Sequence, residues 1–226
     1  MKRRLIIPAL FLGLAAAGFV VLIVTNRMDD RVGTLETFRE LSPSPAPPFA
    51  DPYFAQMADR LGMTGESRDL FQRTQPRFVE HLELGDALVG EYRRGEIHIT
   101  QRFRGRTDSE AVKYIAHEYL HAAWYQALQG RPFIDKRTSD QKNGLKEDID
   151  TVYRQHQAHF DEALRVYNGY FSDPSRAVTQ GSERWYSEMH SILGTEVARS
   201  LLPPRLEAWY ARWLPNRAAT PEEFRG

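Results

Sequence analysis

The sequence contains no cysteine, and its 30 basic side chains are balanced by 30 acidic ones. The absence of cysteine excludes disulfide bonds, thiolate metal ligands and a cysteine nucleophile. Any bound metal ion must therefore be held by histidine nitrogen and carboxylate oxygen. A formal net charge of zero gives no basic field of the kind that attracts nucleic acid, so no nucleic-acid partner is expected.

The chain is long enough for one domain of ordinary size, with some length left over. It has 226 residues, of which 42% are hydrophobic and 12% aromatic. These fractions supply a packed core and are not typical of a disordered or fibrous protein.

The N-terminus has the pattern of a membrane anchor. Residues 5–25 carry no charge, and about 20 apolar residues are needed to cross a bilayer. A cleaved signal peptide is the alternative, but its apolar region usually has only about 7–15 residues. The basic residues 2–4 predict a cytoplasmic N-terminus. The chain is thus expected to be a single-pass membrane protein whose remainder lies outside the cytoplasm, in the periplasm or at the cell surface.

The region after the anchor lacks apolar periodicity. Its proline-rich run at 42–48 predicts a semi-rigid spacer. The sequence therefore divides into four parts. They are a cytoplasmic tail at 1–4, a transmembrane signal anchor at 5–25, a stalk at 26–50 and a folded domain at 51–226.

Hydrophobic periodicity in that domain predicts several helices around a small sheet. Asp51 and Pro52 form a typical helix start, and Thr107 with Glu110 form a capping box. Gly194 is expected to end a helix. The expected helices are 52–61, 107–128, 147–171, 182–193 and 204–214, and the expected strands are 70–74, 89–92 and 96–100. The predicted class is α+β, a mostly helical domain with a small antiparallel or mixed sheet, preceded by one transmembrane helix.

The predicted helix 107–128 contains His117, Glu118 and His121. The histidines are four residues apart, so both imidazoles project from one face and can reach one tetrahedral metal ion. Glu118 is rotated by about 100° from His117 and can act as general base on a metal-activated water. The alternative is a surface helix with two histidines, but the apolar residues around the motif argue against it.

A catalytic zinc ion usually has three protein ligands, and no histidine follows the motif closely. Glu188 lies within an apolar stripe of the predicted helix 182–193, which makes it the predicted third ligand. A structural pairing of Glu188 with an arginine is the alternative. Glu196 is a second candidate ligand, or a residue that holds a ligand histidine through its other nitrogen.

Three segments resemble small zinc metallopeptidases of the zincin type, in particular the gluzincins. They are 116–122 (AHEYLHA), which carries the specific motif, and the looser 187–196 (SEMHSILGTE) and 202–210 (LPPRLEAWY). The resemblance implies Zn²⁺ bound by His117, His121 and Glu188, with Glu118 as general base. It also implies that strand 96–100 is an edge strand to which an extended peptide or protein substrate adds.

The predicted function is zinc-dependent hydrolysis of peptide bonds outside the cytoplasm. Tyr186, His190 and Tyr210 are candidates for stabilising the developing oxyanion. One alternative is a non-catalytic peptide-binding module on the same scaffold, although such a module has no use for Glu118 beside the metal. A zinc amidase that acts on cell-wall peptides is another. The sequence does not indicate the oligomeric state.

Overall fold

A computed structural model describes residues 45–216, apart from 86–87, 129–135 and 170–176. The predicted cytoplasmic tail, the membrane segment 5–25 and most of the predicted stalk lie outside the described residues. Across the described ranges, no helix combines the length and the apolar character that crossing a bilayer requires.

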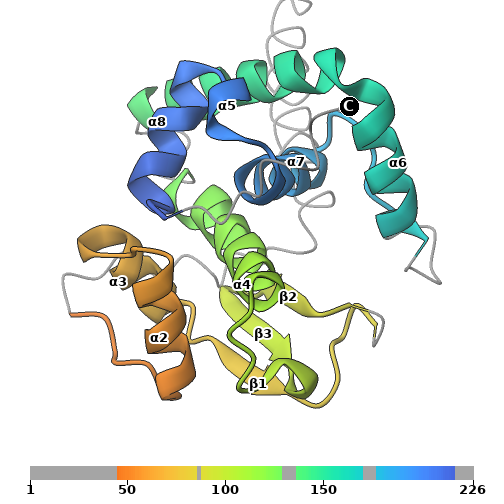
Figure 1. Ribbon diagram of the computed structural model, residues 1–226. Helices are drawn as coiled ribbons and strands as arrows, with labels where there is room; N and C mark the ends of the chain where they lie inside the picture. Colours follow the sequence, from red (N-terminus) through yellow and green to blue (C-terminus); the bar gives the residue numbers. More distant parts are fainter. Residues whose placement is uncertain (1–44, 86–87, 129–135, 170–176, 217–226) are drawn as a thin grey trace, which may run out of the picture.

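The described chain is mostly helical with a small mixed sheet, which confirms the α+β prediction. The sheet consists of β1 (Arg77–Val79), β2 (Gly90–Arg93) and β3 (Glu96–Thr100). Its strand order is β1-β3-β2, with β1 parallel and β2 antiparallel to β3. The sheet lies beside α4 (Ser109–Ala122), as Figure 1 shows.

The strands expected at 89–92 and 96–100 are present as β2 and β3, and they form a hairpin. Arg93 pairs with Glu96, and the two residues between them, Arg94 and Gly95, have φ values of 51° and 84°. Two positive φ values in a two-residue loop are typical of a type I′ turn, whose twist matches that of the flanking strands.

The prediction that strand 96–100 forms an edge is wrong. Strand β3 pairs with β2 over Glu96–Ile99 and with β1 over His98–Thr100, so it is the central strand. The missing partner was β1, whose three residues are too few to show a period. The expected strand 70–74 is also wrong, because this stretch belongs largely to α3 (Gly65–Arg73). Ser67 caps that helix by accepting the Thr64 N–H at 3.1 Å.

The helices expected at 52–61, 107–128, 182–193 and 204–214 start within about two residues of prediction, whereas the helix expected from 147 already begins at Lys136. Asp51 caps α2 (Pro52–Arg60) as expected, whereas α4 is capped by Asp108 and not by Thr107. After α4 the chain makes a π-helical turn, Ala123–Ala127. The expected helix 147–171 is instead two helices, α5 (Lys136–Gln155) and α6 (Gln157–Asn168). They are separated at His156, which leaves the helical region with a φ of −130°.

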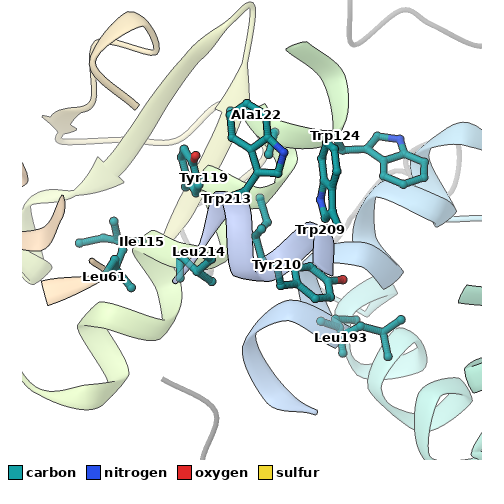
Figure 2. Packing of buried hydrophobic residues seen from close by; sticks show 14 of the residues in the cluster. Leu61, Ile115, Tyr119, Ala122, Trp124, Leu193, Trp209, Tyr210, Trp213 and Leu214 are labelled. Carbon is teal, nitrogen blue, oxygen red and sulfur yellow. The ribbon is translucent and has the colours of Figure 1, made fainter. Parts of the chain in front are cut away.

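Helix α4 lies between two groups of elements (Figure 1). The sheet, α2 and α3 are on one side. On the other are α5, α6, α7 (Glu183–Glu196) and α8 (Pro204–Trp213). Tyr119, Leu193 and Tyr210 belong to the buried cluster that joins α4, α7 and α8, part of which Figure 2 shows.

Gly194 lies inside α7, contrary to the prediction that it ends the helix. A Cβ atom at this position would lie 2.2 Å from Cδ1 of Leu120 and 2.9 Å from Cε1 of Tyr210. Glycine is therefore needed for the close approach of α7 to α4 and α8, and not for termination. This close packing brings the polar residues of α7 next to the motif of α4.

Candidate metal centre

Helix α4 brings the two predicted histidine ligands together. The Nε2 atoms of His117 and His121 are 3.2 Å apart. Their side chains are 21% and 10% exposed, so they are partly shielded from water but accessible from one side. The four-residue spacing therefore places both nitrogens at one point of the helix surface, as predicted.

Helix α7 supplies the third side chain of the cluster. Oε2 of Glu188 is 3.5 Å from Nε2 of His117 and 3.5 Å from Nε2 of His121. The possible ligand atoms of the three residues all lie within 4.8 Å of one another. Two imidazole nitrogens and one carboxylate oxygen in this arrangement match the donor set of a catalytic zinc site.

The charge of Glu188 suits a metal ligand. Burial raises the pKa of its carboxyl, but His121 and His117 act in the opposite direction and bring the pKa well below its usual value. Glu188 is 5% exposed. A buried carboxylate in its charged form requires positive partners, which the imidazoles or a metal ion supply.

The rival candidate Glu196 has another partner. Its Oε1 lies 2.8 Å from Nζ of Lys113, and it is not part of the three-residue cluster. The second nitrogen of His121, Nδ1, is 2.8 Å from the Ser187 hydroxyl. Hydrogen bonds of this kind fix the tautomer and orientation of metal-binding histidines. Sequence reasoning missed Ser187, because its contact with His121 spans 66 residues of the chain.

Glu118 lies beside the cluster and against β2. A Cβ atom on Gly90 would lie 2.8 Å from Cγ of Glu118, so the two are in close contact only because residue 90 has no side chain. The carboxylate also accepts a hydrogen bond from the backbone N–H of Tyr92.

Burial raises the pKa of Glu118 to about 7. His117 lowers the pKa, whereas Glu188 and Glu91 raise it further. A carboxyl group that titrates near neutrality is suited to accept and return a proton.

The cluster opens into a cavity of about 270 Å³. Its walls come from β2 and the chain before it, α4 with the turn after it, α6 and α7. Apolar side chains line it together with the charged residues Lys113, Glu196 and Arg184. The apolar lining residues include Leu84, Leu88, Val89, Ala163, Val166 and Ile192.

Tyr167 of α6 is a second residue that sequence reasoning missed at the site. Its hydroxyl donates to Oε1 of Glu188 at 2.8 Å, and the side chain lines the cavity. In the expected helix 147–171, Tyr167 lies on the apolar face, which by itself predicts only a core position. A buried tyrosine needs a hydrogen-bond partner, but nothing local in the sequence identifies Glu188 as that partner.

The three predicted oxyanion candidates do not line the cavity. The Tyr186 hydroxyl donates to Asp150 at 3.0 Å, and the Tyr210 hydroxyl donates to the backbone carbonyl of His190 at 2.7 Å. His190 accepts the indole N–H of Trp209 at 2.7 Å and is fully buried. These contacts hold α7 to α5 and α8.

Comparison with known proteins finds no matching family model, no similar curated protein and no similar solved structure. Arguments about function therefore depend on the residues and geometry of this chain alone.

Proposed function

We propose that this protein is a zincin-like zinc metallopeptidase that hydrolyses peptide bonds outside the cytoplasm. The observation that carries the proposal is the convergence of His117, His121 and Glu188 at a cavity, with the carboxyl of Glu118 beside them. Bound by these three residues, Zn²⁺ would supply Lewis-acid activation of water and of the substrate carbonyl. The predicted membrane anchor supports the location outside the cytoplasm.

Glu118 is the proposed general base. It would accept a proton from the attacking water and deliver that proton to the departing amine. The Tyr92 N–H and the close contact with Gly90 hold this carboxylate in place.

The outer edge of β2 is the proposed binding place for an extended peptide. Val89, Gly90, Glu91 and Tyr92 line the cavity, and β2 pairs with β3 on its other side. The Tyr92 N–H points to Glu118 and therefore away from β3. A peptide that adds to this edge would pass over the three-residue cluster and would bond to outward-facing backbone groups of β2 other than the Tyr92 N–H, which Glu118 occupies. This strand replaces β3 in the role that the resemblance implied.

The experiment that tests the proposal compares the purified full-length chain with Glu118→Gln. Hydrolysis of a mixed peptide library is followed by mass spectrometry, and bound zinc is measured in the same samples. We expect Glu118→Gln to retain zinc and to lose at least about 100-fold in turnover, because general acid–base catalysis typically contributes that much.

Glu110→Gln is the matched control, since Glu110 lies on the same helix, is exposed and pairs with Arg106. It should leave hydrolysis unchanged. Unchanged hydrolysis by Glu118→Gln, or zinc-loaded wild-type protein without any hydrolysis, would contradict the proposed function.

A further inference from the structure

Glu188 makes contacts through both of its carboxylate oxygens. Oε2 faces the Nε2 atoms of His117 and His121, whereas Oε1 accepts the hydrogen bond from Tyr167 at 2.8 Å. Because Glu188 is only 5% exposed, bulk water contributes little to its solvation. A buried carboxylate oxygen without a donor is costly, and Tyr167 provides that donor for Oε1.

The backbone next to Tyr167 is held in place by its neighbour. The Asn168 side chain accepts the Val178 N–H at 2.8 Å and donates to the Val178 carbonyl at 3.3 Å. Val178 is itself buried. This two-point contact fixes the end of α6 to the chain that leads into α7. The phenol of Tyr167 is therefore directed at Glu188 by the fold and not by its own rotamer alone.

We propose that Tyr167 is a positioning residue for Glu188, which by occupying Oε1 keeps Oε2 directed at the metal ion. The proposal rests on the metal centre of the proposed function. Without the phenol hydroxyl, the carboxylate can rotate about its Cγ–Cδ bond, and Oε1 loses its donor. Removal of a residue that orients a metal ligand usually weakens metal binding by about 10- to 100-fold.

Another tyrosine provides a matched control. Tyr153 of α5 donates its hydroxyl to Asp161 of α6, so Tyr153→Phe also removes a tyrosine–carboxylate hydrogen bond at α6. Asp161 is not part of the three-residue cluster and does not line the cavity. If Tyr167 acted on stability alone, the folded Tyr167→Phe protein would bind Zn²⁺ with wild-type affinity, as Tyr153→Phe should.

The test uses full-length wild-type protein, Tyr167→Phe and Tyr153→Phe. The affinity for Zn²⁺ is measured by competition with a chromophoric chelator, and the visible spectrum is recorded after substitution with Co²⁺. The Tm is measured after removal of metal with EDTA. Tyr167→Phe should bind Zn²⁺ about 10- to 100-fold more weakly and alter the Co²⁺ spectrum. Its metal-free Tm should fall more than that of Tyr153→Phe, because Oε1 of Glu188 is buried whereas Asp161 is exposed. Tyr153→Phe should keep wild-type affinity.

Wild-type affinity and an unchanged Co²⁺ spectrum in Tyr167→Phe would overturn this inference alone. Failure of the wild-type protein to bind Zn²⁺ would contradict the proposed function and this inference together. The wild-type measurement therefore separates the two failures.

Discussion

Because residue 90 is a glycine, it leaves room for the side chain of Glu118 beside β2. Glu118 lies on the β2 backbone at Gly90, where an added Cβ would be 2.8 Å from its Cγ and 2.9 Å from Cδ1 of Ile99. Ile99 is fully buried and cannot move away at low cost. A side chain at position 90 would therefore displace Glu118 from the place it occupies beside the three-residue cluster.

This contact predicts the effect of Gly90→Ala. The added methyl group should displace the Glu118 carboxylate and lower kcat/KM by about 10- to 100-fold, because a misplacement of about 1 Å can have that effect. Zinc content should stay at the wild-type level, since none of the three candidate ligands contacts residue 90 in this way. Gly144→Ala in α5 is the control, because its methyl group meets only the flexible end of Arg205. A kcat/KM for Gly90→Ala equal to that of the control would show that this contact does not set the position of Glu118.

Residue-level features were predictable where the pattern is local. The spacing of His117, Glu118 and His121 fixes their relation on any helix, so their arrangement follows from the sequence alone. Glu188 could be inferred because a carboxylate in an apolar stripe needs a partner. Ser187 and Tyr167 could not be identified in this way, because their roles depend on contacts across 66 and 21 residues of sequence.

At the scale of elements, polar contacts along their whole length join α7 to the antiparallel α4 and to the turn after it. Lys113 pairs with Glu196 at one end, and the three-residue cluster lies between. At the other end, the Trp124 indole in the turn after α4 donates to Glu183 at 2.8 Å. Glu183 also pairs with Lys142 and, at 2.8 Å, with Lys146 of α5. One carboxylate thus connects α4, α5 and α7.

Glu183→Gln should therefore destabilise the protein in a pH-dependent way. Burial raises the pKa of Glu183, but Lys142 and Lys146 outweigh it, and the pKa lies below its usual value. A folded-state pKa below the unfolded one gives stability that is present above the unfolded pKa and is lost as pH falls through the folded pKa. At pH 7 the variant should be less stable by about 1.5–3 kcal/mol, the range for hydrogen bonds to a charged group.

Denaturant unfolding of wild type and Glu183→Gln, measured from pH 7 to pH 3, tests this expectation. The difference in the free energy of unfolding should be largest near neutral pH and should shrink as Glu183 becomes protonated. A difference that is constant across this pH range would contradict the assigned charge network.

Element types were predictable where periodicity extended over many residues, and less so where it did not. The amphipathic patterns of α2, α4 and α8 and the alternation in β3 gave the correct types. The short strand β1 could not be seen, and its absence made β3 appear to be an edge. At Gly194, close contact with Leu120 and Tyr210 outweighed the tendency of glycine to end a helix.

In the molecule as a whole, the candidate metal centre lies between the group formed by the sheet, α2 and α3 and the group formed by α5, α6, α7 and α8. Helix α4 carries two candidate ligands and packs against the sheet, whereas the third comes from α7 in the helical part (Figure 1). A metal ion held by both helices would tie these parts together. Binding to the folded state alone stabilises a protein by about 4 kcal/mol at a ligand concentration 1,000 times its Kd. We therefore expect the protein to have a lower Tm after its metal ion has been removed with a chelator than when zinc is bound.

Zinc per chain, measured by elemental analysis, tests the central claim most directly. The samples are the full-length wild-type protein, Glu188→Ala and Glu196→Ala, each reconstituted at neutral pH. We predict about one zinc ion per chain in the wild type and in Glu196→Ala, and a loss or sharp weakening in Glu188→Ala, as expected for three protein ligands. A wild-type chain without zinc, or a Glu188→Ala variant that retains it fully, would contradict the proposed metal centre.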